Sequence, residues 1–161
     1  MNTAILYYES PIGTICIEHT EGTIHALYFQ AEKPLTKRLP NEFESKVTQQ
    51  LDRYFEGSLT SFQLSLAPAG TDFQQKVWNQ LLQIPFGKTY SYKEMSIQLG
   101  DPKLIRAAAT ANGKNPILLL IPCHRVIGTN GDLIGYAGEL WRKQWLLDHE
   151  NKFANGVQTL F

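Results

Sequence analysis

Polar and apolar residues alternate through residues 3–30, which is the period of strands that bury one face. Three strands are predicted there, over residues 4–8, 14–18 and 23–29, with turn signals between them. Residues 32–40 are charged and contain proline, so they predict a loop. Apolar residues then recur at helical spacing over residues 43–55, and Gly57 ends that helix. This part of the chain therefore predicts a small sheet with one helix.

Three further helices are predicted in the second half of the chain, each opened by a capping residue. We expect the third to run to about Ala111, where Asn112-Gly113 ends it, and a short Gly-Asp-Pro turn joins it to the second. Two helices joined in this way predict a helix-turn-helix, a pattern that helix pairs in a core share. The residues that open the three helices are Thr71 with Gln74, Ser91 with Glu94, and Asp101 followed by Pro102.

Residues 58–70, which include Pro68 and Gly70, predict a linker between domains at residues 1–70 and 71–161. The longest apolar run, residues 117–122, is far too short to span a bilayer, and no signal peptide is visible at the N-terminus. The chain has two cysteines, too few for a disulfide framework. We therefore expect a cytoplasmic protein with free thiols and no membrane contact.

The net charge of zero hides an uneven distribution. Residues 1–71 carry five basic and eight acidic side chains, a net of −3, whereas residues 88–125 carry six basic and two acidic ones, a net of +4. A local basic patch can attract an anionic polymer such as a nucleic acid, and a solvated surface is the alternative interpretation.

A cysteine stands directly beside a histidine at residues 121–127, in the sequence Ile-Pro-Cys-His-Arg-Val-Ile. A buried cysteine is usually an inert apolar residue, whereas a thiol beside a base can be a nucleophile, because only the thiolate attacks. Apolar residues precede this motif and the hairpin signal at residues 129–132 follows it. Cys123 and His124 are therefore candidates for a reactive site.

A zinc site is a weaker hypothesis for the N-terminal part. Cys16, His19 and His25 lie close in sequence, but three ligands make a poor structural site, and positions 16 and 19 of one strand point to opposite faces. We expect no metal and no other cofactor.

The Cys-His motif and its flanking elements, in this order along the chain, resemble the O6-alkylguanine-DNA alkyltransferases, most closely the bacterial stand-alone type. The resemblance is sharpest over residues 71–150. It implies an α+β fold, with a ribonuclease-H-like N-terminal sheet and helix, then a mostly helical, winged-helix-like C-terminal domain that carries the helix-turn-helix. The elements that carry the resemblance are Tyr92, Arg106, Asn115-Pro116, residues 121–127, residues 135–138, residues 145–147 and His149-Glu150.

The resemblance also implies roles for individual residues. Cys123 would accept the alkyl group from guanine O6, in a single, self-inactivating turnover. His124 would remove the thiol proton through a bound water, and Glu150 would orient that imidazole. Asn115 would hold the turn before the active-site strand. Tyr92 would crowd the phosphate of the target nucleotide and donate to the leaving guanine.

The partner implied is double-stranded DNA that contains O6-alkylguanine, bound by a monomer at the minor groove; activity on O4-alkylthymine is left open. The damaged base must leave the stack, and Arg106 would fill the gap. The small side chains of Ala107 and Ala108 would let the helix approach DNA closely.

The base pocket would use backbone groups at Val126, Tyr136 and Ala137. Three positions depart from the family pattern: Ala137 stands where many relatives carry serine, and Ala109 and Glu139 each stand where a glycine is usual. A backbone N–H survives the change at Ala137, whereas Ala109 and Glu139 could narrow the pocket or weaken DNA binding.

Two other function classes compete with alkyl transfer. The first is a sensor that binds the lesion without reacting, and such sensors lack the cysteine that this chain has at position 123. The second is a Cys-His thiol hydrolase, for which adjacent sequence positions make an unusual nucleophile and base.

Overall fold

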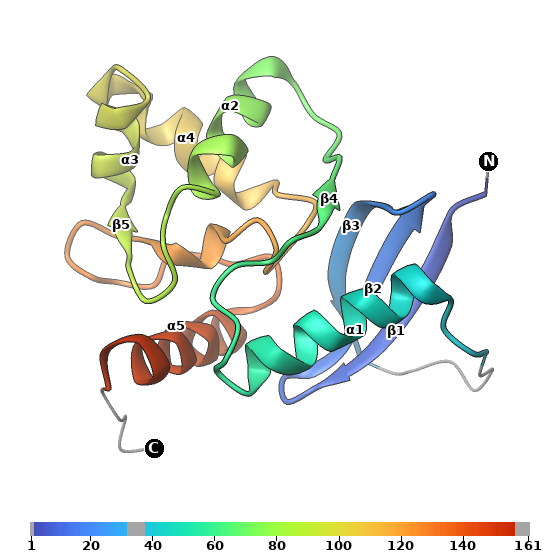
Figure 1. Ribbon diagram of the computed structural model, residues 1–161. Helices are drawn as coiled ribbons and strands as arrows, with labels where there is room; N and C mark the ends of the chain where they lie inside the picture. Colours follow the sequence, from blue (N-terminus) through green and yellow to red (C-terminus); the bar gives the residue numbers. More distant parts are fainter. Residues whose placement is uncertain (1, 32–37, 157–161) are drawn as a thin grey trace.

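The computed structural model describes residues 2–31 and 38–156, so that most of the predicted loop at residues 32–40 lies outside the described residues. Figure 1 shows the N-terminal strands with one helix lying across them on one side of the molecule. The helices of the C-terminal part gather on the other side. Among the described residues, no helix combines the length and apolar character needed to cross a membrane. This arrangement is α+β, and the predicted fold class is confirmed.

The N-terminal sheet is built from three consecutive antiparallel strands, and its order is β1-β2-β3-β4. Tight turns at Gly13 and Gly22, both with positive φ, reverse the chain between the first three strands. These strands lie where the alternation predicts them, and each is one to three residues longer than predicted. The fourth lies inside the predicted linker and pairs parallel with β3. The strands are β1 (Ala4–Ser10), β2 (Gly13–Thr20), β3 (Thr23–Gln30) and β4 (Ser65–Leu66).

Helix α1 (Glu42–Phe55) buries one apolar stripe and ends before Gly57, as predicted. A capping box between Asn41 and Glu44 opens it. Val47, Leu51 and Tyr54 are almost fully buried within the main hydrophobic core. Tyr54 lies near the C-terminal end of α1, and this end comes close to α5 (Leu140–Asn155).

The three predicted caps all form in the C-terminal part, where backbone N–H groups donate to the side chains of Thr71, Ser91 and Asp101. The third helix differs from its prediction: it begins with a turn of 3-10 helix, and the α-helix continues through Gly113 rather than stopping near Ala111. The elements are α2 (Asp72–Leu81), α3 (Tyr92–Gln98), η1 (Pro102–Leu104), α4 (Ile105–Gly113) and α5 (Leu140–Asn155).

A two-stranded parallel sheet joins the helix pair to the Cys-His motif. Its strands are β5 (Tyr90–Ser91) and β6 (Val126–Ile127). The hairpin signal at residues 129–132 gives a turn, closed by the N–H of Gly128 donating to the Asp132 carbonyl at 2.7 Å, but no hairpin: β6 pairs with β5 instead.

The N-terminal sheet is also bonded directly to the segment that leads to Cys123. The Leu27 N–H donates to the Pro116 carbonyl at 3.0 Å, and the Leu118 N–H donates to the Leu27 carbonyl at 3.1 Å. Strand β3 therefore fixes the start of the segment that presents the cysteine.

Candidate active site

Cys123 opens a single turn of 3-10 helix, η2 (Cys123–Arg125), and not a strand as expected. Asn115 braces the loop before it. Its amide donates to the Ile121 carbonyl at 2.8 Å, and its side-chain oxygen accepts from the Ile117 N–H at 2.9 Å. Two bonds from one buried side chain close residues 115–121 into a fixed loop, so Asn115 lies where a turn-holding residue is needed.

The Cys123 thiol is almost fully buried, with 3% of the residue exposed. Burial raises the pKa of this thiol to about 11, and Asn115 and Lys143 oppose that rise only in part. At neutral pH the resting thiol is therefore protonated, and it needs a base at the moment of reaction.

His124 is fully buried, and its Nε2 lies 2.8 Å from Oε2 of Glu150. Because a carboxylate accepts, Nε2 carries the hydrogen, which leaves Nδ1 with a free lone pair. Within residues 2–31 and 38–156, this Nδ1 has no hydrogen-bond partner. Burial lowers the pKa of His124 below its usual value, so the imidazole is neutral at neutral pH and able to accept a proton.

Glu150 is held on every side by donors. Arg125 binds it with Nε to Oε1 at 2.8 Å and Nη2 to Oε2 at 3.0 Å, and the Tyr54 hydroxyl donates to Oε2 at 2.6 Å. Burial raises the pKa of Glu150, but His124 and Arg125 outweigh it and hold that pKa well below its usual range. The carboxylate is thus a permanent anion behind the imidazole.

A cavity of about 240 Å³ lies against Cys123. Tyr92 is at its wall, where the phenol donates to the Ile134 carbonyl at 3.3 Å and accepts from the Asn112 amide at 3.4 Å. Of the predicted pocket residues, Tyr136 and Ala137 line it. The full lining is Tyr92, Ala109, Asn112, Gly113, Leu118, Cys123, Ile134, Gly135, Tyr136 and Ala137.

Val126 is placed differently from the prediction. It is fully buried in β6 and is not part of the cavity lining, and its N–H already donates to the Cys123 carbonyl. The Val126 N–H is therefore engaged in closing η2 and is not presented to a base in this structure.

The four predicted DNA contacts fall into three environments. Arg106 and Ala107 are exposed on α4, and Tyr92 is at the cavity wall. Ala108 is fully buried in the core, so its side chain offers DNA no surface, and that prediction is corrected. One of the six basic side chains counted over residues 88–125 is not exposed, because Arg125 is buried against Glu150. Five bases and two acids, a net of +3, remain exposed over residues 88–125.

Lys143 is a site residue that the sequence did not reveal. It is fully buried on α5, and its Nζ lies 3.2 Å from the Gly135 carbonyl and 3.4 Å from the Ile134 carbonyl. It therefore fastens the loop over the cavity and places a positive charge near Cys123. A lone lysine in a charged helix gives no sequence signal of burial.

Glu139 lies outside the cavity lining, and its carboxylate accepts from the Trp141 indole at 3.0 Å. The expected intrusion of this charge into the pocket is thus not seen. Its backbone has φ of 77° and ψ of 145°, a conformation that favours glycine. Ala109, the other position where the family usually has glycine, does line the cavity.

We expect Glu139→Gly to stabilise the protein. Relief of the positive φ stabilises the fold by on the order of 1–3 kcal/mol, and loss of an acidic side chain at the start of α5 costs about 0.3–1 kcal/mol. The melting temperature should rise by about 2–4 °C for each kcal/mol of net stabilisation. Glu139→Ala is the matched control, because it removes the carboxylate but keeps Cβ; an equal rise in both variants would contradict the backbone explanation.

The three residues considered for zinc do not form a site. The His19 ring binds Glu44 at 2.8 Å, Cys16 is fully buried, and His25 is exposed. Within the part of the chain that the structure describes, no group of three metal-ligating side chains gathers where an ion could be held.

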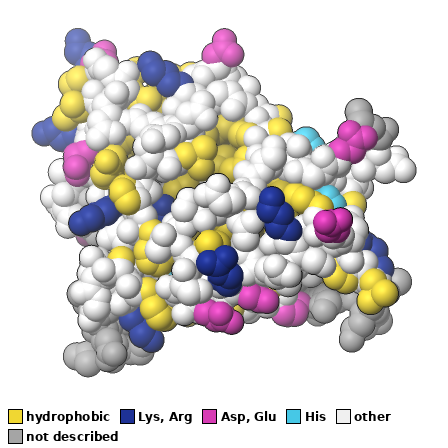
Figure 2. All heavy atoms as spheres, in the orientation of Figure 1, with side chains coloured by type: hydrophobic (Ala, Val, Ile, Leu, Met, Phe, Trp, Pro, Cys, Tyr) yellow, Lys and Arg dark blue, Asp and Glu magenta, His cyan; other side chains and the backbone are white. Residues whose placement is uncertain are grey.

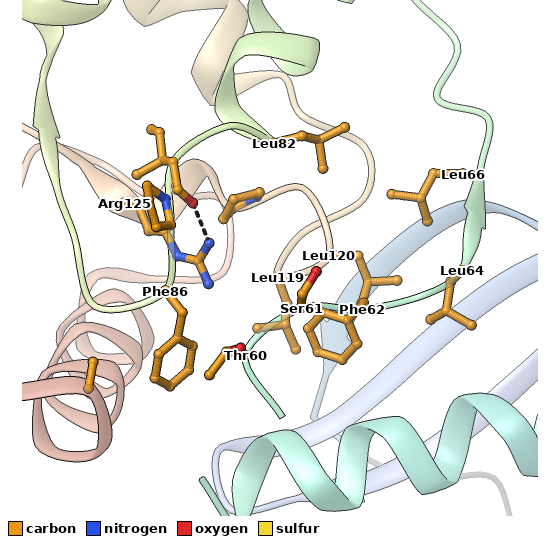
Figure 3. A pocket seen from close by; sticks show the side chains of 14 residues that line it. Thr60, Ser61, Phe62, Leu64, Leu66, Leu82, Phe86, Leu119, Leu120 and Arg125 are labelled. Atoms are coloured by element: carbon orange, nitrogen blue, oxygen red, sulfur yellow. Dashed lines mark hydrogen bonds between the residues drawn. The ribbon is translucent and has the colours of Figure 1, made fainter. Parts of the chain in front are cut away.

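A larger hollow of about 730 Å³ lies between the two parts of the molecule, and Figure 2 shows apolar side chains gathered there. Figure 3 shows Phe62, Leu64, Leu66 and Phe86 around it, with Arg125 at one side hydrogen-bonded within the wall. That bond runs from Nη1 to the Ile84 carbonyl at 2.7 Å. Cys123 and His124 do not line this hollow, and the candidate thiol opens on the smaller cavity instead.

Comparison with known proteins supports the resemblance. Two family models match: the 6-O-methylguanine DNA methyltransferase ribonuclease-like domain over residues 5–68, and the DNA binding domain of the same family over residues 72–152. Methylated-DNA–protein-cysteine methyltransferases from Methanosarcina barkeri and Mycolicibacterium paratuberculosis are 44% and 48% identical to the chain. These matches cover 90% and 95% of the chain and 97% and 95% of the relatives.

Solved structures are similar to the chain as well. The O6-methylguanine methyltransferase of Mycobacterium tuberculosis is 40% identical, with a TM-score of 0.84, and 97% of each chain is covered. A structure of Mycobacterium tuberculosis OGT in complex with DNA has a TM-score of 0.83 at 41% identity, covering 92% of this chain and 93% of that one.

Proposed function

The chain belongs to the 6-O-methylguanine DNA methyltransferase family, and from this premise we propose that it repairs DNA by moving an alkyl group from guanine O6 to Cys123. The observation that carries the proposal is the position of Cys123 at a small cavity, next in the sequence to the buried His124. Glu150 is hydrogen-bonded to the His124 ring and orients it. A thiol with a pKa of about 11 needs such a base.

The reaction balances as one displacement. The Cys123 thiol proton passes through a bridging water to the free Nδ1 of His124, and the Nε2 hydrogen stays on the imidazole, bonded to Glu150. The sulfur attacks the alkyl carbon as the bond from that carbon to O6 breaks. The electron pair of that bond goes to the guanine, which takes a proton from the Tyr92 hydroxyl at the cavity wall, the donor we assign. Solvent returns a proton to Tyr92, and His124 releases the thiol proton to solvent, so that one proton in total moves from the thiol to the guanine.

DNA binding follows from the surface around the cavity. The exposed bases near the helix pair, which include Lys93, Lys103 and Lys114, give a local positive field for the phosphate backbone. Arg106 stands three positions before Ala109, which lines the cavity, so the two residues share one side of α4, and we assign to Arg106 the role of filling the gap that a flipped base leaves. The protein would act as a monomer on duplex DNA that contains O6-alkylguanine. Binding of O4-alkylthymine is a separate outcome for the same assay.

A titration tests the stoichiometry. The product is a thioether that no residue of the chain can cleave, so we expect transfer to plateau at one alkyl group per protein molecule. Duplex DNA carrying O6-methylguanine in excess, followed by mass spectrometry of the peptide that contains Cys123, measures both the plateau and the acceptor. Continued turnover would contradict this proposal.

The same preparation separates the competing functions. A sensor would bind the alkylated duplex and leave the mass of Cys123 unchanged. A thiol hydrolase would release product from an acyl ester in repeated cycles, which a sulfur committed to a stable thioether cannot do.

A further inference from the structure

One hydroxyl group of the N-terminal part of the molecule hydrogen-bonds to Glu150, the carboxylate behind His124. Tyr54, at the end of α1, donates to Oε2 of Glu150 at 2.6 Å, across 96 positions of sequence. This is the same carboxylate oxygen that accepts from His124 Nε2 at 2.8 Å. A side chain of the predicted domain at residues 1–70 thus touches the relay that serves Cys123.

We propose that Tyr54 is a positioning residue for alkyl transfer, which holds Glu150 in place and sets how strongly that carboxylate attracts a proton on His124. This inference deepens the proposed function and rests on it. It gives the N-terminal sheet and helix a part in the chemistry, beyond that of a scaffold.

The tyrosine is fixed from several sides. The residue is only 1% exposed, and its ring packs against the rings of Phe62, Phe86 and His149, with centroids 5.3, 5.9 and 5.1 Å away. The Tyr54 carbonyl accepts from Nε2 of His149 on α5 at 2.8 Å. Burial and the nearby Glu150 raise the pKa of the Tyr54 phenol well above its usual value, so the hydroxyl remains a donor at every working pH.

The Tyr54 hydroxyl changes how much negative charge Glu150 presents to the His124 imidazole. The groups that face Glu150 are His124 and Arg125 from η2 and Tyr54 from α1, with Lys143 and His149 on α5 and Tyr136 in the cavity loop further out. Each donor draws negative charge from the carboxylate. Without the Tyr54 hydroxyl, more of that charge faces the imidazole, and the charged form of His124 becomes more favourable.

Loss of the Tyr54 hydroxyl is expected to move the pH dependence of alkyl transfer toward higher pH. His124 must be neutral to accept the thiol proton, and the rate falls as pH drops through its pKa. In Tyr54→Phe that pKa is higher, so we expect the acid limb of the rate profile to move toward higher pH by on the order of half a unit. We also expect the rate on the high-pH plateau to fall about tenfold, because Glu150 without the Tyr54 hydroxyl no longer holds the imidazole in one orientation.

The experiment compares Tyr54→Phe with Tyr8→Phe and with the unaltered protein. Tyr8 is a matched control, because its hydroxyl also donates to a carboxylate, Asp52, at 2.6 Å in the same N-terminal part, but away from the site. Single-turnover transfer from O6-methylguanine duplex is measured across pH 5–9 for all three proteins. Melting temperatures are recorded beside the rates.

A shifted acid limb in Tyr54→Phe, with the Tyr8→Phe profile unmoved, supports the positioning role. In a Glu150→Gln background, adding Tyr54→Phe should alter the rate by less than about twofold, since Tyr54 acts through Glu150. An unshifted profile, or a shift toward lower pH, overturns the role even if the rate falls, because loss of folded protein lowers the amplitude at every pH alike. Absence of transfer by the unaltered protein would instead overturn the proposed function.

Discussion

Replacement of Cys123 with alanine is expected to abolish alkyl transfer and to leave the affinity for alkylated duplex within about threefold of the unaltered protein. Among the residues that line the 240 Å³ cavity, Cys123 alone carries a sulfur, and the tyrosine hydroxyls there have raised pKa values and stay protonated. Removal of one buried atom costs about 1 kcal/mol of stability, too little to unfold the domain. Binding depends on the surface and the cavity walls, which the substitution leaves intact.

Cys16→Ala is the matched control for this prediction. Cys16 is the other free thiol, and it is fully buried in strand β2 of the N-terminal sheet. We expect it to keep a plateau of one transfer per molecule. Transfer that persists in Cys123→Ala but disappears in Cys16→Ala would show that Cys16 is the acceptor. Filter binding or fluorescence anisotropy with O6-methylguanine duplex measures the retained affinity, and melting curves verify that both variants are folded.

The elements that could be predicted from the sequence are those with local causes. Side-chain alternation predicted β1, β2 and β3, and side-chain caps predicted the starts of α2 and α3, because the interactions that form them span only a few residues. Strand β4 was missed, since its two residues pair with β3 through tertiary position and have no periodicity of their own. The extension of α4 through Asn112 and Gly113 was missed for a similar reason: the Asn112 side chain is buried and donates to Tyr92, which offsets the weak helix propensity of that pair.

The site residues also divide into those with a local signal in the sequence and those placed by tertiary packing. Cys123 and His124 are adjacent in the chain, and the resemblance added Glu150 and Asn115, which the structure places beside them or in the loop before them. Tyr54 comes from a helix whose sequence reads as an ordinary amphipathic segment, and Lys143 comes from α5, a helix that the residue pattern did not predict. Their roles depend on how α1 and α5 pack, and no local pattern encodes that. Arg125 likewise reads as a surface base but is buried as the bidentate partner of Glu150.

Arg106→Ala is expected to slow repair of duplex DNA by about 10- to 100-fold, with little effect on reaction with free O6-alkylguanine base. Extrusion of a base costs on the order of a few kcal/mol, and a side chain that fills the gap returns part of that free energy; each 1.4 kcal/mol is about tenfold in rate. Arg106 is exposed, and within the described residues its guanidinium makes no hydrogen bond or ion pair. Its truncation therefore leaves the fold unchanged, so a slower reaction with duplex DNA is caused by a lost contact with DNA and not by a change in the protein.

Lys103→Ala separates this role from simple charge. Lys103 is also exposed and lies in the turn of 3-10 helix just before α4, so it can contact phosphate but lies outside the helix that borders the cavity. Its loss should weaken duplex affinity in a salt-dependent way and leave the transfer rate at saturating protein unchanged, because a phosphate contact is equal before and after the base leaves the stack. Arg106→Ala should lower the saturated rate itself. Equal losses on duplex and free base would remove Arg106 from base flipping, since the free base has no stack to leave.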